Sequence, residues 1–186
     1  MSDWTRRTFL AATGAGLAAC TSHPTGLTET PAQAIDANVQ AALDQLYATV
    51  PGTAELGARS EGILVIPRIR KLGFWVSGAY GEGALLIGPA IVEYYSMSLA
   101  GFGFTFGAQE FNQALFFLTA DALQGFRVAD GWELGVDAAV ALPRRGVAAG
   151  LSSGQINRPI QEVVWGQRGL IADASLVGAK YSRIIR

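Results

Sequence analysis

The chain has 186 residues, 50% of them hydrophobic and 16% charged, with 14 basic and 15 acidic side chains. This composition predicts one folded domain with a tail, and it excludes a disordered chain and a nucleic-acid binder held by bulk charge. The single cysteine, Cys20, and the single histidine, His23, lie near the N-terminus. They exclude a disulfide within the chain and argue against a zinc site or a histidine-based catalytic device further along.

The N-terminal segment has the features of an export signal. Arg6 and Arg7 precede an uncharged stretch over residues 9–19, which is shorter than the ~20 residues that a helix needs to span a bilayer. The residues around the arginine pair, including Phe9 and Leu10, resemble a twin-arginine export signal. We therefore predict that residues 1–19 are a signal peptide and that the protein is exported.

A second motif, Leu17-Ala18-Ala19-Cys20, resembles a lipobox. In bacterial lipoproteins the cysteine of this motif receives diacylglycerol and becomes the new N-terminus, and its thiolate is the nucleophile. The alternative is a buried structural cysteine in an ordinary N-terminal helix. We predict that Cys20 is lipidated, that residues 20–30 are a polar tether, and that the protein is anchored at the periplasmic face of a membrane, since two acyl chains anchor stably.

A helix is expected over residues 31–50, beginning at Pro31 and ending before Pro51. Its apolar residues recur at helical spacing, namely Ile35, Val39, Leu43, Leu46 and Val50. We interpret this stripe as the face that packs on a sheet. A helix lying on the membrane surface is the alternative, which the acidic polar face disfavours. A second short helix is expected over residues 53–60.

The rest of the chain has the pattern of β-structure. A strand over residues 62–67 is expected to end at Pro67. Further strands are expected over residues 73–87, 94–109, 115–118, 134–142 and 169–179, with a short helix after Thr119. Glycine and alanine on many of these strands permit close approach, bulges and bends. We predict an α+β fold in which a strongly curved, nearly closed or barrel-like antiparallel sheet carries an N-terminal helix and one or two short helices.

One basic cluster stands out, formed by Arg68, Arg70 and Lys71, with Trp75 nearby. Arginine binds phosphate oxygens and tryptophan suits the level of lipid headgroups, so these four residues are candidates for headgroup contact. The alternative is a solvated loop. A second basic set, Lys180, Arg183 and Arg186, fits a solvated tail.

Other chemistry has weaker support in the sequence. The glycine-rich segments at residues 78–83 and 101–107 lack the Gly-Lys-Ser/Thr of a phosphate loop, so we expect no cofactor there. Asp137 and Asp173 lie on small-residue strand faces and are the best pair for a carboxylate-dependent hydrolase. We favour the ordinary explanation, in which each residue forms a hydrogen bond to the backbone or an ion pair with an arginine. We expect neither enzymatic activity nor a metal site.

Five segments in order resemble SYLF domains, over roughly residues 35–182. The first is the opening of the domain, Glu61-Gly-Ile-Leu-Val-Ile-Pro67 together with residues 71–86. The other four are Ala100-Gly-Phe-Gly-Phe-Thr-Phe-Gly-Ala-Gln109, Leu115-Phe-Phe-Leu-Thr119 with Ala122-Leu123, Leu134-Gly-Val-Asp-Ala-Ala139 and residues 169–179. The resemblance, to a family that includes the yeast actin-patch SYLF proteins, implies non-enzymatic binding of anionic lipids of the phosphoinositide or phosphatidic-acid type. Asp173 departs from the family pattern because many relatives have glycine there.

The residues and the resemblance together predict a SYLF-like lipid-binding domain over residues 31–186. The expected partner is a phospholipid membrane. Actin and nucleic acid are not expected partners. A structural lipoprotein that binds an envelope protein is the alternative, and a hydrolase that uses Asp137 and Asp173 is a third hypothesis.

Overall fold

The computed structural model describes residues 30–74, 76–102, 107–134, 158–169 and 178–186. Its first described helix, α2 (Pro31–Thr49), buries the predicted apolar stripe, because Ile35, Val39, Leu43 and Leu46 are all buried. A short helix, α3 (Thr53–Ala58), follows after Gly52, whose φ of 83° suits glycine. The Thr53 hydroxyl donates to the carbonyl of Val50 at 2.7 Å and joins the two helices.

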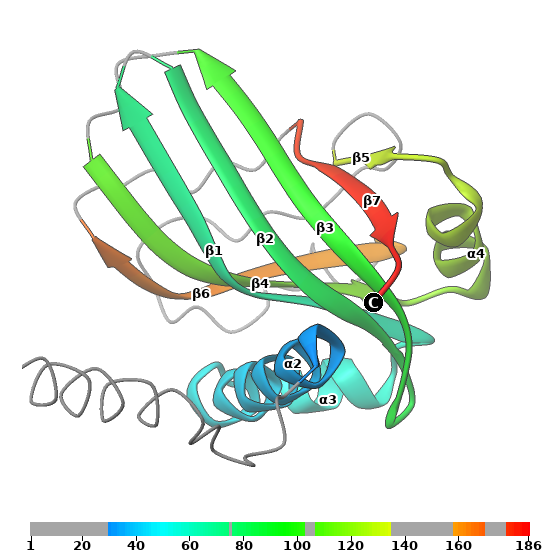
Figure 1. The fold of residues 1–186 in the computed structure, drawn as a ribbon. Helices are drawn as coiled ribbons and strands as arrows, with labels where there is room; N and C mark the ends of the chain where they lie inside the picture. Colours follow the sequence, from blue (N-terminus) through cyan, green and yellow to red (C-terminus); the bar gives the residue numbers. More distant parts are fainter. Residues whose placement is uncertain (1–29, 75, 103–106, 135–157, 170–177) are drawn as a thin grey trace, which may run out of the picture. The chain divides into compact units, whose positions relative to one another are not determined.

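The strands form one antiparallel sheet in the order β5-β7-β3-β2-β1-β4-β6. The strands are β1 (Gly62–Phe74), β2 (Val76–Ile87), β3 (Ala90–Phe102), β4 (Gly107–Phe117), β5 (Trp132–Glu133), β6 (Ile160–Gly169) and β7 (Lys180–Ile184). The sheet curls into half a barrel, with α4 (Ala120–Val128) at one end (Figure 1). The predicted α+β class with a strongly curved antiparallel sheet is therefore confirmed.

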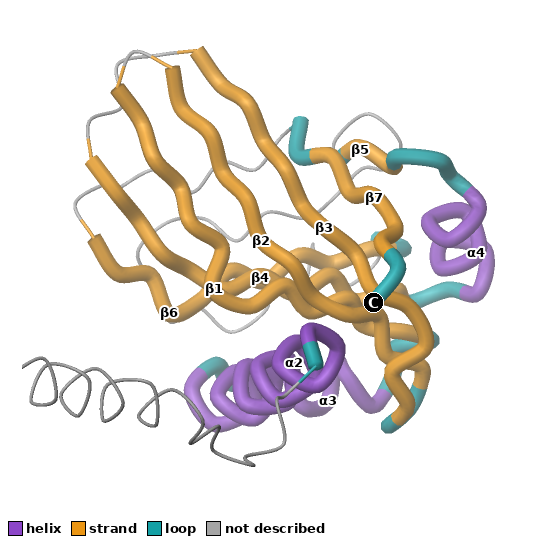
Figure 2. Tube along the Cα trace, viewed as in Figure 1, coloured by secondary structure: helices purple, strands orange, loops and turns teal. Residues whose placement is uncertain are grey.

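Each face of the sheet carries its own hydrophobic core. On the α2 face, side chains such as Val65, Ala84 and Phe116 pack with α2 and α3. On the opposite face, which we call the α4 face, side chains such as Leu64 and Leu115 pack with α4 and with β7. Figure 2 shows α2 and α3 together near one end of the long strands, so a stretch of each long strand extends beyond the helices.

β1 continues through Pro67, and the predicted end of the strand at Pro67 is wrong. The ladders to β2 and β4 both skip Pro67 and Arg68, and each has a register shift there. Proline is tolerated at such a bulge because its missing N–H is not needed by the ladder. The backbone N–H of Arg68 donates instead to the side-chain Oδ1 of Asn112 at 2.9 Å. The bulge turns the strand without breaking it.

The sheet bends where several bulges and a close backbone contact lie side by side. A second register shift, between β4 and β6, lies opposite Asn112, next to the β1 bulge. On the other side of β1, a Cβ added to Gly83 would overlap the carbonyl oxygen of Val65. Only glycine allows β2 to lie this close to β1. This crease across β2, β1, β4 and β6 produces part of the predicted curvature.

The other strands expected from the sequence differ in how they compare with the structure. The single strand expected over residues 94–109 is wrong, because Phe102 ends β3 and Gly107 begins β4, and β2 and β1 lie between these strands in the sheet. The strands expected over residues 134–142 and 169–179 fall largely outside the described residues. The short helix after Thr119 is present as α4, and the Thr119 side chain accepts a hydrogen bond from the backbone N–H of Ala122.

Candidate functional site

The structure divides the predicted basic cluster between the two faces of the sheet. Arg68 and Arg70 are exposed on the α2 face, beyond the helices. Lys71, the next residue of β1, is only 6% exposed and lies opposite Ala79 and Gln109, which are buried as well. Neighbouring residues of a strand point to opposite faces. Lys71 therefore does not share a surface with the two arginines.

Arg70 belongs to a row of polar side chains that crosses six of the seven described strands. Paired positions run from β7 through β3, β2, β1 and β4 to β6, as Lys180, Ser98, Tyr80, Arg70, Glu110 and Arg168. Five of these residues are exposed and Glu110 is half-buried. Arg70 and Glu110 form an ion pair of 3.6 Å at the surface, which contributes little to stability because solvent screens it.

Two large side chains with apolar surface are exposed here, Tyr80 within this row and Leu72 beside it. Leu72 is 63% exposed and Tyr80 is 53% exposed. The neighbours of Leu72 across the ladders are Gly78 and Ala108, which are also exposed and too small to shield it. We call this part of the α2 face the open face, and it comprises the row, Arg68 and Leu72.

The open face is positively charged although the whole chain has a net charge of −1. It carries Arg68, Arg70, Arg168 and Lys180. Arg186 forms an ion pair with Glu82, whose carboxylate also accepts a hydrogen bond from Tyr80, at the border of this face. The hydrogen bonds from Tyr80 and Arg186 lower the pKa of Glu82 below its usual value. Glu133 of β5 pairs with Lys180 at the edge of this face. With Glu82, Glu110, Glu133 and Arg186 included, the described residues of the face comprise five basic and three acidic side chains.

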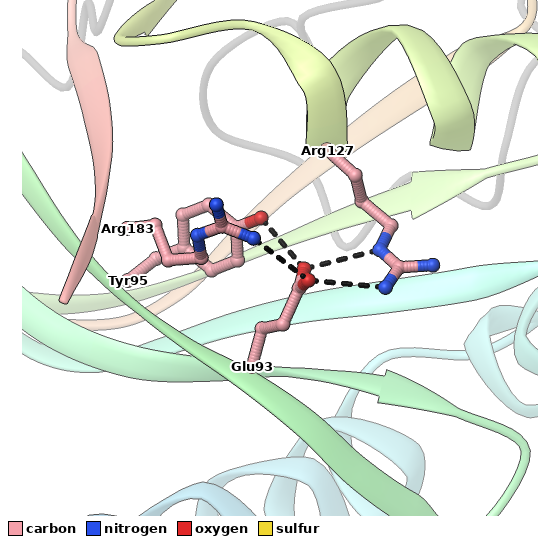
Figure 3. Close-up of polar contacts among 4 residues, drawn as sticks. All are labelled: Glu93, Tyr95, Arg127 and Arg183. Carbon is pink, nitrogen blue, oxygen red and sulfur yellow. Dashed lines mark hydrogen bonds and ion pairs between the residues drawn. The ribbon is translucent and has the colours of Figure 1, made fainter. Parts of the chain in front are cut away.

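A groove lies at the α4 end of the sheet, on the other face. Its volume is about 650 Å³, and its lining comprises Glu61, Glu93, Ala120, Leu123, Gln124, Arg127, Val128 and Arg183. Figure 3 shows Arg127 from α4, Arg183 from β7 and Tyr95 from β3 converging on the carboxylate of Glu93. The groove is within the size range of small-molecule sites.

Glu93 holds both arginines in place. Arg127 donates to it from Nε at 3.1 Å and from Nη2 at 3.0 Å. Arg183 donates from Nη1 at 3.2 Å and the Tyr95 hydroxyl donates at 2.9 Å. The hydrogen bond from Arg127 is the largest cause that lowers the pKa of Glu93 below its usual value. Burial and the bond to Glu93 raise the pKa of Tyr95.

The sequence interpretation missed this groove. The sequence predicted Arg183 only as part of a solvated tail, and it predicted no role for Glu93 or Arg127. The partners of Glu93 lie 34 and 90 positions away along the chain. No local motif links residues so far apart.

A buried polar chain lies inside the α4 core. Gln113 of β4 donates through Nε2 to Glu162 of β6 at 2.6 Å, and the hydroxyl of Tyr181 of β7 donates to Oε1 of Gln113 at 2.9 Å. The other oxygen of Glu162 has no hydrogen-bond partner among the described residues. Burial raises the pKa of Glu162 to about 7. Burial also raises the pKa of Tyr181 well above its usual value.

The remaining predicted site residues lie outside the described residues. They are Arg6, Arg7, Phe9, Leu10, Leu17, Ala18, Ala19, Cys20, Trp75, Asp137 and Asp173. Within the part of the chain that the structure describes, no group of three or more metal-ligating side chains is placed to hold a metal ion. In that same part, no helix has the length and apolar character needed to cross a bilayer.

No protein-family model matches this chain, and no curated protein matches it.

Proposed function

We propose that this protein is an exported lipoprotein, anchored in the bacterial cell envelope through Cys20, that binds anionic phospholipid without catalysing a reaction. The open face of the sheet makes the contact. The observation that carries the proposal is the row of exposed cations, with Tyr80 and Leu72 standing out from the same surface. The resemblance of the ordered segments to SYLF domains supports the same class of ligand.

The chemistry of the open face suits a headgroup layer. Arginine guanidinium groups bind phosphate oxygens through paired N–H donors, and lysine adds a mobile charge. A tyrosine places its ring at the boundary between apolar and aqueous layers. Arg68 and Arg70 lie on β1, where Arg70 pairs with Tyr80 of β2, and Arg168 lies on β6, two strands further along the same face. A surface of lipid phosphates could therefore contact several of them at once.

The expected affinity of the face alone is modest. Each basic residue near an anionic membrane contributes about 1 kcal/mol, and the contribution falls with salt. The three glutamates on the face oppose part of this attraction. A lipid anchor compensates because it holds the domain at the membrane and raises the effective concentration of headgroups. The anchor and the open face therefore contribute to one function.

Flotation with vesicles tests the face separately from the anchor. The full chain carrying Cys20→Ala, which cannot be acylated, is mixed with neutral vesicles and with vesicles that contain phosphatidic acid. We expect binding to the anionic vesicles only, with a clear loss on raising the salt concentration. The double change Arg70→Gln and Arg168→Gln should reduce binding about thirtyfold, since two contacts of about 1 kcal/mol each are removed.

The matched control removes two exposed arginines elsewhere, through Arg59→Gln and Arg158→Gln. It changes the net charge equally and should retain most of the binding. Equal binding to neutral and anionic vesicles would contradict the proposal, and so would an equal loss in both double variants. One stoichiometric protein partner, captured by crosslinking in envelope fractions without lipid binding, would favour the alternative of a protein-interaction lipoprotein.

A further inference from the structure

Within the part of the chain that the structure describes, each of the two arginines in the groove keeps a terminal nitrogen that could bind a ligand. Arg127 uses Nε and Nη2 for Glu93, and Arg183 uses Nη1. Among the described residues, no hydrogen bond occupies Nη1 of Arg127 or Nη2 of Arg183. The two side chains are 40% and 63% exposed, whereas Glu93 is 13% exposed. Two guanidinium groups therefore face the groove while one partly buried carboxylate fixes their positions.

Two guanidinium groups held in this way form a preorganised site for an oxyanion. A carboxylate accepts paired N–H donors from a guanidinium group, and ligands bind more tightly when the donors are already ordered. Glu93 supplies this order because it contacts both arginines. The cost of fixing two long side chains is met when the protein folds, before a ligand arrives.

The charge of the lining distinguishes between oxyanions. The two arginines are opposed by Glu93 and by Glu61, which also lines the groove. The lining therefore has no net charge. Glu93 and the two arginines that it contacts have a net charge of +1 together. A phosphate monoester carries close to two negative charges at neutral pH and would be poorly compensated. A ligand with a single negative charge, such as a carboxylate, fits the balance better.

One face of α4 forms the other wall of the groove. Ala120, Leu123, Gln124, Arg127 and Val128 all line it, at the spacing of a single helix face. Three of them are apolar, and Val128 is 73% exposed. An aliphatic chain that extended from the arginines along α4 would cover this apolar surface. Burial of such surface favours binding by about 25 cal/mol per Å².

We propose that this groove binds a small aliphatic monocarboxylate, with the carboxylate between Arg127 and Arg183 and the aliphatic part against α4. The site lies on the opposite face of the sheet from the open face, and the inference does not depend on membrane binding.

Sodium octanoate is a suitable probe because it combines one carboxylate with an unbranched chain. The full chain carrying Cys20→Ala is titrated below the micelle concentration, and binding is followed by the NMR shifts of the α4 backbone amides. We expect a saturable response from octanoate. Octanamide, which has the same chain without the charge, should bind at least about tenfold more weakly, because a charge-assisted contact of roughly 1.5 kcal/mol is lost. Inorganic phosphate should bind more weakly than octanoate.

Two opposite changes test the charges. Arg183→Gln should weaken octanoate binding about tenfold, since one charge-assisted contact disappears. Glu61→Gln should strengthen it, because a negative charge leaves the lining. Arg59→Gln, which changes an exposed arginine outside the groove lining and outside the open face, is the matched control and should leave the affinity unchanged. Thermal unfolding of each variant verifies that the fold is intact.

Equal affinity for octanoate and octanamide would overturn the inference. So would an unchanged affinity in Arg183→Gln, or shifts of the α4 amides that inorganic phosphate reproduces at the same concentration.

Discussion

At the scale of single residues, the buried carboxyl of Glu162 links stability to pH. Its pKa is raised to about 7 by burial. Between the ordinary carboxyl pKa and about 7, the folded protein keeps a proton that the unfolded chain releases, so the free energy of unfolding falls as the pH rises. Above about 7 the side chain is ionised in both states and the benefit of the neutral form is gone.

Glu162→Gln should remove this dependence, since the amide is neutral at every pH. We expect the variant to be more stable than the parent at pH 8, by up to about 3 kcal/mol, from a pKa that moves from 4.5 to about 7. Urea unfolding between pH 5 and 8 measures the effect. The lowered pKa of Glu93 acts at more acidic pH and with the opposite sign, because that stabilisation is lost as the pH falls. Parallel pH profiles for parent and variant would contradict the assignment.

Gly83 is the residue on which the crease depends most directly. A Cβ at this position would overlap the carbonyl oxygen of Val65 and approach the Cα of Ile66. Backbone atoms cannot move aside without breaking the pairing of β1 and β2, so Gly83→Ala should destabilise the protein by more than about 2 kcal/mol. Gly78→Ala, on the same strand, meets no atom closer than 3.8 Å and serves as the control. Equal melting temperatures for the two variants would argue against the contact.

At the scale of elements, α4 is attached to the sheet by an aromatic cluster. The ring of Phe126 lies within 4.8–6.2 Å of the rings of Tyr95, Phe117 and Tyr181 between centroids, and it packs edge-on against Trp132. These partners come from β3, β4, β7 and β5. One side chain of α4 therefore joins strands from both halves of the sheet.

Phe126→Ala should cost about 3–5 kcal/mol, because it leaves a cavity among these rings. Val128→Ala, two residues later on the same helix, should change stability little, since Val128 is largely exposed. Chemical denaturation of both variants measures the difference. If the two losses were similar, α4 would not be anchored through Phe126.

The elements also show what the sequence could and could not predict. The stripe from Ile35 to Leu46 indicated a helix and its buried face, because helical periodicity is local. Pro67 indicated a strand end that does not exist, since the bulge there depends on Asn112 of another strand. The single strand expected over residues 94–109 contains the end of β3 and the start of β4. A period of two residues cannot show where one strand ends and the next begins.

The faces of the basic cluster could not be predicted for a related reason. A bulge shifts the alternation by one position, so the face of every later residue of β1 depends on whether the bulge is present. Ile69 follows the bulge and is buried in the α4 core. Arg70, the next residue, therefore lies on the open face, and Lys71 lies on the α4 face. The groove was still harder to foresee, because its charges meet only after β3, α4 and β7 have come together.

At the scale of the whole molecule, the proposed export and anchoring depend on the N-terminal segment, whereas the proposed lipid binding depends on the sheet. Cys20→Ala should leave export intact and move the protein from the membrane fraction to the soluble periplasmic fraction, because the acyl chains no longer hold it. Replacement of Arg6 and Arg7 by lysine should instead retain the protein in the cytoplasm. Cell fractionation with labelled fatty acid measures both outcomes. Membrane retention of the Cys20→Ala form, with label still incorporated, would contradict lipidation at this residue.

The position of β7 in the sheet affects how the protein reaches its native state. Arg183 meets a glutamate 90 positions earlier, and Tyr181 meets a glutamine 68 positions earlier. Contacts at such sequence separations form slowly, because a long loop must close before they are made. Until β7 docks, β3 presents an unpaired strand edge that a second unfolded chain could join. We therefore expect aggregation to compete with folding mainly during the interval before β7 covers that edge.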